Sequence, residues 1–165
     1  MSAQATKETS DSSRQEYANS VQYLTFYLNN QEYGIEITRV QAIQGWQPVT
    51  AIPNSPNEIL GVINLRGSIV PIMDLRIKFQ MPNINYDDVT VVIIVKVTTA
   101  NGEKVVGFVV DAVSEVYNVS DDQMNPSPEF GSAAETEYVK GLASIEGSMV
   151  IALDVEKLVV RGIVE

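Results

Sequence analysis

The chain contains no histidine and no cysteine among its 165 residues. Without cysteine it can form neither a disulfide framework nor an iron–sulfur cluster, and it has no thiol nucleophile. Without histidine it lacks an imidazole base, a Ser-His-Asp triad and an ordinary zinc site. Carboxylates, Lys, Tyr, Ser and Thr are the side chains left for catalysis. These absences favour a protein with no catalytic residue, cofactor or metal over an enzyme.

Positive charge is scarce too, with 11 Lys and Arg against 21 Asp and Glu, a formal net charge of −10. Residues 86–165 hold five bases and fourteen acids, and residues 105–139 contain no Lys or Arg. An acidic surface repels phosphate backbones and anionic lipids, so we expect no nucleic-acid partner. Whether the acidic segment steers partners or only aids solubility stays open at this stage.

Long apolar runs are missing as well. The first residues lack the apolar core of a signal peptide, and no run approaches the ~20 residues of a membrane helix. We therefore expect a cytoplasmic protein without direct membrane insertion. Residues 1–20 contain no Val, Ile, Leu or Phe, but five Ser and two Thr. Such a stretch buries too little surface to offset its ordering entropy, which predicts a disordered tail.

Leucine is scarce beside the β-branched residues: the chain has 8 Leu, 23 Val and 15 Ile. β-Branched side chains suit a pleated, half-buried surface and lose rotamer freedom in helices. The composition therefore predicts a mainly all-β fold. Alternation and turn signals place the expected strands at residues 21–28, 33–37, 61–65, 68–73, 89–98, 104–113, 115–119, 141–145 and 148–153.

Helices are expected only in short pieces. Asp74 and Asp154 each precede a helical pattern and would act as N-caps, the second for residues 155–160. The spacing of three between Ile37, Val40 and Ile43 predicts one or two further helical turns that end at Gly45. Residues 121–137, with their prolines, predict a long loop.

The two halves of the sequence resemble each other. An offset of 80 places residues 61–74 on residues 141–154, and five of these fourteen positions are identical. An offset of 73 places residues 34–40 on residues 107–113. Each copy has about five short strands, too few for a sizeable core alone. We therefore predict two small barrels in tandem that pack together and fold as one domain.

Few residues suggest chemistry. Asp74 and Asp154 occupy equivalent positions, and paired carboxylates can perform acid–base catalysis, but helix capping after an internal duplication explains both. Asp121 and Asp122 lack the spacing of a calcium loop. Arg66, in a tight turn, is the better candidate, because a rigid turn presents a guanidinium well to a carboxylate or carbonyl.

The string Gly-Val-Ile-Asn-Leu-Arg-Gly at residues 61–67, followed by Ile-Val-Pro-Ile-Met-Asp-Leu-Arg-Ile-Lys-Phe at 69–79, resembles the CheW family of bacterial chemotaxis coupling proteins. The resemblance extends through residues 33–37, 106–111 and 138–142 and covers about residues 20–160. It implies two SH3-like five-stranded barrels within a domain of residues 21–160. The first barrel would cover roughly residues 21–80 and the second 88–160, with strand exchange between them left open.

The resemblance also implies a function. Members of the family are non-catalytic scaffolds that couple transmembrane chemoreceptors to the histidine kinase CheA in polar arrays at the membrane. The expected partners are the regulatory domain of CheA, the cytoplasmic tip of the receptors and other CheW molecules in array rings. A generic SH3-like peptide-binding module with another partner is the alternative.

The family pattern transfers to eight residues of this chain as partner-binding positions. Arg66 lies in the motif turn, and the others lie on neighbouring segments. The predicted partner-binding residues are Val40, Ile43, Gly61, Arg66, Val91, Gly107, Val113 and Val116. Where many relatives carry Glu, this chain has Ala42. Arg66 must therefore pair with Glu36 or Glu58 instead, or remain free for a partner protein.

Overall fold

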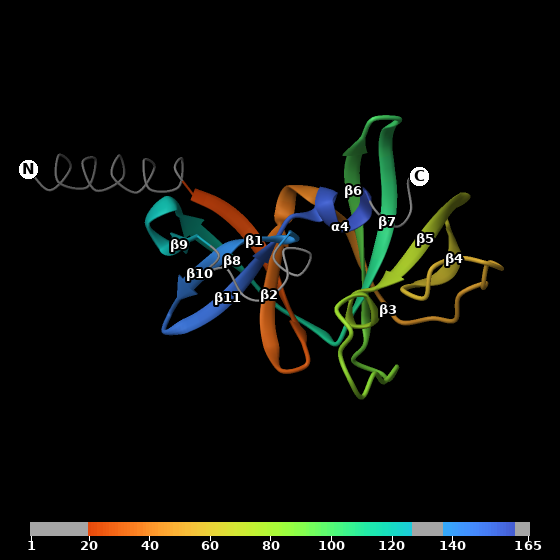
Figure 1. Cartoon of the computed structure of the whole chain (residues 1–165), viewed down its shortest axis with the longest axis horizontal. Coiled ribbons are helices and arrows are strands. Elements are labelled where there is room, and N and C mark those ends of the chain that lie inside the picture. Colours follow the sequence, from red (N-terminus) through yellow and green to blue (C-terminus); the bar gives the residue numbers. More distant parts are fainter. Residues whose placement is uncertain (1–19, 127–136, 161–165) are drawn as a thin grey trace, which may run out of the picture.

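The computed structural model describes residues 20–126 and 137–160 (Figure 1). The predicted disordered tail lies outside the described residues except for Ser20, and so does the middle of the predicted loop at 121–137.

Two antiparallel-rich sheets, each curled into a barrel, make up the fold and lie side by side in Figure 1. The six-stranded sheet has the order β8-β1-β2-β11-β10-β9 and the five-stranded sheet the order β3-β6-β7-β5-β4. The predicted pair of SH3-like barrels is confirmed, and we refer to the six-stranded and the five-stranded barrel. The strands of the first are β1 (Ser20–Leu28), β2 (Gln31–Glu36), β8 (Ala112–Ser120), β9 (Met124–Asn125), β10 (Val139–Ile145) and β11 (Ser148–Leu153). Those of the second are β3 (Val40–Gly45), β4 (Ile59–Leu65), β5 (Ser68–Asp74), β6 (Val91–Thr99) and β7 (Gly102–Val110).

The barrels are not consecutive halves of the chain, so the predicted boundaries of 21–80 and 88–160 are wrong for the two sheets. The β1–β2 hairpin joins the C-terminal strands, while β6 and β7 join β3, β4 and β5. The sequence left strand exchange between the barrels open, and in the structure the barrels do exchange strands. The chain crosses between barrels at the 3-10 turn η1 (Ile37–Arg39) and again at Asp111, the single residue between β7 and β8.

The internal repeat is visible in the strand register. Parallel pairing sets Ile72 opposite Gly107 in one barrel and Ala152 opposite Gly34 in the other. These two pairs are related by the repeat, because the offset of 80 relates Ile72 to Ala152 and the offset of 73 relates Gly34 to Gly107. Barrel closure repeats as well: Thr50 bridges Val62 in the five-stranded barrel, and β9 pairs with β10 at the equivalent place in the six-stranded barrel. Each barrel therefore contains strands from both copies.

The described residues form three apolar clusters. The largest lies between the barrels and contains Phe26 and Ile35 from one sheet and Ile93 and Phe108 from the other. Two smaller clusters fill the interiors of the six-stranded and the five-stranded barrel. Because the chief core is shared by both sheets, the barrels fold as one unit, which fits a chain of this size.

The short helices partly match expectation. Asp74 caps α2 (Leu75–Lys78) by accepting from the Arg76 amide at 2.9 Å, and Asp154 accepts from the Lys157 amide at 3.2 Å in α4 (Val155–Val160). Both predicted caps are confirmed. Of the helical turns predicted from Ile37 to Gly45, the first is present as the 3-10 turn Ile37–Arg39, but the rest of the prediction is wrong, because Val40 and Ile43 lie in β3. A β-bulge between Val40 and Ala42 produces the spacing of three.

The predicted loop at 121–137 is wrong at its start, where η2 (Asp121–Gln123) and β9 lie. Ser120 and Gln123 form a capping box around η2. This turn leads the chain from β8 to β9, so it belongs to the closure of the six-stranded barrel.

Candidate partner-binding surfaces

The edge strands β3 and β8 occupy equivalent positions, each following a crossing between the barrels. Ile43 on β3 is 47% exposed and Val116 on β8 is 48% exposed. The offset of 73 relates these two residues. Each barrel therefore presents an apolar side chain at the same place on an edge strand whose outer side pairs with no other described strand, and such edges bind partner chains.

The other three predicted valines face inward. Val40, Val91 and Val113 are half-buried and pack against the central cluster between the barrels. Val40 lies opposite Val95, and Val113 lies opposite Phe26. These residues anchor the edge strands to the central cluster. They therefore contribute more to the shape of the surface than to contact with a partner.

The two predicted glycines are buried, and both are needed for close packing. Gly61 has φ of +150°, and a Cβ built there would lie 2.1 Å from the Thr50 carbonyl oxygen that closes the barrel. A Cβ on Gly107 would lie 2.6 Å from Ile72 Cδ1 and 2.9 Å from Val92 Cγ1. Neither residue lies on the surface, so an effect of either on partner binding must act through the position of neighbouring strands.

Arg66 is exposed in the two-residue turn between β4 and β5. Its φ of +52° and the φ of +88° at Gly67 are those of a type I′ hairpin turn. Asn64 Oδ1 accepts from the Gly67 amide at 2.9 Å and stiffens the turn. Among the described residues Arg66 makes no ion pair, and Glu36 pairs with Lys140 instead. The sequence left open whether Arg66 pairs with Glu36 or Glu58 or remains free, and in the structure its guanidinium is free of any ion pair with a described residue.

A buried polar network was missed by the sequence reasoning. Arg76, 3% exposed, donates through Nε to Asp74 Oδ1 and through Nη2 to Asp74 Oδ2, both at 3.0 Å. Its Nη1 donates to Asp111 Oδ1 at 2.7 Å, and Asp111 Oδ2 accepts from the Asn29 amide at 2.7 Å. The network thus clamps the Asp111 crossing to α2 and to the β1–β2 turn. The Asp-Leu-Arg string at 74–76 was the available signal.

An aromatic pair continues this network to the surface. Tyr86 donates to Asp74 Oδ2 at 2.6 Å, and Arg76 lies 4.9 Å from the centre of the Tyr86 ring. Trp46, just after β3, stacks on Tyr86 with ring centres 4.5 Å apart. Burial, and then the hydrogen bond to ionised Asp74, raise the pKa of Tyr86 to about 12. The end of the β3 edge is therefore connected to the barrel crossing.

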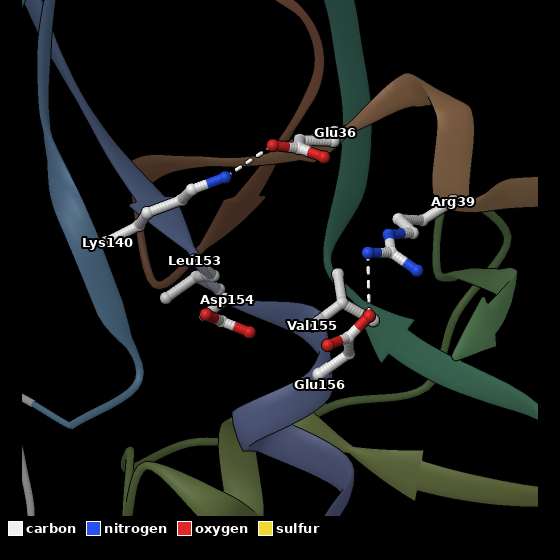
Figure 2. A pocket seen from close by; sticks show the side chains of 7 residues that line it. All are labelled: Glu36, Arg39, Lys140, Leu153, Asp154, Val155 and Glu156. Atoms are coloured by element: carbon white, nitrogen blue, oxygen red, sulfur yellow. Dashed lines mark hydrogen bonds and ion pairs between the residues drawn. The ribbon is translucent and has the colours of Figure 1, made fainter. Parts of the chain in front are cut away.

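The other crossing has its own clamp, shown in Figure 2. Arg39 Nη2 lies 2.6 Å from Glu156 Oε1 of α4, and Lys140 pairs with Glu36. Burial opposes the charge on Lys140, but the hydrogen bond to Glu36 and the neighbouring Tyr23 raise its pKa overall. Both pairs line a cavity of about 120 Å³ that also touches Leu153, Asp154 and Val155.

A family model described as the CheW-like domain matches residues 22–162. The chain belongs to this family. It is 48% identical over 137 residues to the chemotaxis protein CheW of Klebsiella aerogenes, covering 83% of this chain and 80% of that protein. A probable chemotaxis protein CheW of Rhizobium etli is 38% identical over 135 residues, covering 82% of this chain and 84% of that protein.

A solved structure gives the same answer. The crystal structure of the scaffolding protein TtCheW from Thermoanaerobacter tengcongensis matches with a TM-score of 0.75 and 29% identity, covering 84% of this chain and 92% of that one. Membership of the family and this scaffold relative support a role as a chemotaxis adaptor, and they point to a non-catalytic protein.

Two features of the described residues bear on other classes of function. No group of three or more acidic side chains there is arranged to hold a metal ion. Neither α2, α4 nor any other described helix has the length and apolar character needed to cross a bilayer. The paired-carboxylate alternative fails on geometry, since Asp74 is fully buried against Arg76 while Asp154 caps a helix of the other barrel.

Proposed function

We propose that this protein couples chemoreceptors to the histidine kinase CheA, as a cytoplasmic, non-catalytic adaptor in arrays at the membrane. The observation that carries the proposal is the pair of equivalent edge strands with exposed Ile43 and Val116. An adaptor must bind two partners at once, and one apolar edge on each barrel supplies two separate docking surfaces. The proposed partners are the CheA regulatory domain, the cytoplasmic receptor tip and further copies of the chain in rings.

The predicted residues divide into two roles in this proposal. Ile43, Val116 and the free guanidinium of Arg66 contact partners directly, because these side chains are exposed. The half-buried valines and buried glycines hold the strands that carry them. The proposed residues of this supporting set are Val40, Gly61, Val91, Gly107 and Val113.

Coupling then works by linkage between binding equilibria. If the adaptor binds the two signalling states of a receptor unequally, a shift between those states changes the state of the bound kinase. We expect each interface to be modest, so that many simultaneous contacts in an array keep the assembly together.

The test uses Arg66→Ala, with Glu146→Ala as a matched control because Glu146 holds the equivalent turn position with φ of +49°. We expect Arg66→Ala to change the free energy of unfolding by less than about 0.5 kcal/mol, since the side chain is exposed. It should weaken the ternary complex with CheA and a receptor cytoplasmic fragment roughly tenfold, as expected for loss of a charge-assisted hydrogen bond. Pull-down and stimulated kinase activity measure the loss.

Glu146→Ala should leave assembly within about twofold, because surface substitutions away from a contact have little effect. Unchanged ternary assembly and kinase activation with folded Arg66→Ala protein would contradict the proposed role of Arg66. Binding of a receptor peptide without any recruitment of CheA would favour the generic peptide-binding module.

A further inference from the structure

The five-stranded barrel has a cleft where β5 and β7 diverge. Among the described residues these parallel strands pair only from Ile72 and Gly107 onward, and Figure 1 shows them separating toward their starts. Before this pairing begins, residues 68–71 pair with β4 and residues 102–105 pair with β6, each along one edge. A cleft of about 420 Å³ lies between the two stretches. Two strand edges without a described neighbour therefore face each other across it.

The equivalent place in the six-stranded barrel is bridged by a side chain. Gln31 Nε2 donates to the Met149 carbonyl oxygen at 2.9 Å, just before the pairing of β2 with β11 begins. The offset of 73 relates Gln31 to Lys104. The offset of 80 relates Met149 to Ile69, whose carbonyl oxygen accepts from no described side chain. Because the N–H and C=O of a strand residue point to the same side, both backbone groups of Ile69 face the open cleft.

The cleft also holds an unpaired charge. Its lining contains two charged residues, Glu103 and Lys104. Glu103 Oε2 lies 2.8 Å from Lys96 Nζ, whereas Lys104 makes no ion pair with a described residue. The charge that remains is therefore a free ammonium, on a chain whose formal net charge is −10. Charge complementarity favours an acidic occupant.

The strand register fixes which side chains an occupant would meet. Ile69 is level with Lys104 across the cleft, since each stands three residues before the pair of Ile72 and Gly107. Alternate residues of a strand share a face, so both side chains lie on the face of the central cluster. Ile69 is 64% exposed there. The residues that follow them lie on the other face, in or against the cluster inside the barrel: Val70 and Val105.

We propose that the cleft binds an extended segment of a protein partner in which a glutamate stands between two β-branched residues. The segment adds a strand between β5 and β7 and exchanges backbone hydrogen bonds with Ile69. Its glutamate lays its methylene groups on Ile69 and its carboxylate against Lys104. The two β-branched neighbours point to the other face, toward Val70 and Val105. Four residues of a strand span about 13 Å, so a segment of four or five residues fills the cleft.

The test is a titration of the full chain with the pentapeptide acetyl-Thr-Val-Glu-Val-Thr-amide, followed by backbone amide NMR shifts. We expect saturable shifts at Ile69, Val70 and residues 103–105, with a dissociation constant of about 1 mM, as a short added strand with one charge pair gives. The Ile69 amide should also exchange with solvent more slowly, because it becomes hydrogen-bonded. The same peptide with lysine in place of glutamate should bind about tenfold more weakly, because it brings a like charge to Lys104.

Two substitutions of Lys104 separate the charge from the open edge. Lys104→Met removes the ammonium alone, so it should weaken binding of the glutamate peptide about threefold and abolish its advantage over the lysine peptide. Lys104→Gln introduces the residue type of the equivalent Gln31, so its amide should bridge to the Ile69 carbonyl and weaken the glutamate peptide at least about tenfold. Lys157→Met removes an equal charge at an exposed position of α4 and should leave binding unchanged.

Several results would overturn the proposal. They are the absence of saturable shifts up to about 20 mM peptide, equal binding of the glutamate and lysine peptides, and undiminished binding by Lys104→Gln. None of these measurements involves a receptor or CheA, so their failure leaves the proposed function intact.

Discussion

The two barrels have the same strand order but hold their crossings differently. In the five-stranded barrel, a helix arginine reaches the Asp111 crossing. The side chains of Arg76 and its second partner Asp74 are only 4% and 0% exposed, while that of Asp111 is 36% exposed. In the six-stranded barrel, a helix glutamate reaches Arg39 of the η1 crossing, and these side chains are 34% and 37% exposed. Arg76 and Glu156 are related by the offset of 80, and each reaches a residue at its crossing, Asp111 or Arg39; the charges are reversed, and the helix side chain is no longer buried.

This difference teaches that the two copies keep an ion pair between the helix and the crossing but differ in its charges and burial. A buried charge pair cannot lose one partner without leaving an uncompensated charge in a dry site. An exposed pair is solvated whether it forms or not, so its contribution is small. We therefore expect the Asp111 crossing to be rigid and the η1 crossing to be the one that adjusts.

The largest expected effect comes from breaking the buried clamp. Arg76→Met should lower the free energy of unfolding by about 3–5 kcal/mol, because fully buried Asp74 then loses its guanidinium. Arg39→Met at the exposed clamp should cost less than about 1 kcal/mol. Urea unfolding of the two variants measures both values, and similar losses would contradict the comparison.

A smaller effect is expected where the barrels close. Gly61→Ala combines a positive φ with a Cβ 2.1 Å from the Thr50 carbonyl oxygen, which the closing strand cannot avoid. At the equivalent Gly141, the nearest atoms would be Met124 Sδ at 2.7 Å, a flexible side chain, and the Asn125 carbonyl oxygen at 2.8 Å. We expect Gly61→Ala to cost about 3 kcal/mol and Gly141→Ala about half as much. Urea midpoints of the two variants test the order, and the reverse order would count against it.

The third prediction concerns alkaline pH. Burial and the bond to Asp74 raise the pKa of Tyr86 from 10.0 to about 12, so folding favours the protonated phenol. The resulting stabilisation is fully present below pH 10 and is lost as the pH rises toward 12. The difference in unfolding free energy between the natural chain and Tyr86→Phe should therefore shrink over this range. A difference that stays constant from pH 9 to pH 12 would show that the Asp74 contact does not control this titration.

The smallest effect is expected in the two hairpin turns. Arg66 and Glu146 both adopt a positive φ, of +52° and +49°, before a glycine. Asn accepts this conformation more easily, so Arg66→Asn and Glu146→Asn should each raise the free energy of unfolding by up to about 1 kcal/mol. Of the two, we expect only Arg66→Asn to weaken ternary assembly with CheA and receptor. Thermal unfolding and pull-down together check this, and a loss of assembly with both variants would mean that turn shape, not the guanidinium, matters.

Local signals predicted the hairpins well. The turn at Arg66 and Gly67, the caps at Asp74 and Asp154, and the final helix Val155–Val160 lie where expected. The spacing of Val40 and Ile43 misled, because a bulge in a strand and a helical turn give the same period over so few residues. The expected strand at 104–113 ran through Asp111, where the chain in fact changes barrel.

Among the candidate site residues, sequence could not separate surface from core. Ile43 and Val116 are exposed. The other three residues pack against the central cluster, although they too are β-branched residues in strands: Val40, Val91 and Val113. Which face of an edge strand meets the core depends on the neighbouring sheet. The role of Arg76 was equally hidden, because its second partner, Asp111, is distant in sequence.

By itself the sequence determined a β fold with an internal repeat, its tight turns and its helix caps, since each of these depends on residues close together in the chain. Tertiary structure alone decided that the β1–β2 hairpin and the β6–β7 hairpin exchange places between the barrels. The two copies have nearly the same pattern of apolar alternation, so either pairing satisfies it. The choice came from the shared core and from the clamps at Asp111 and Arg39, which form only when segments far apart in the chain meet.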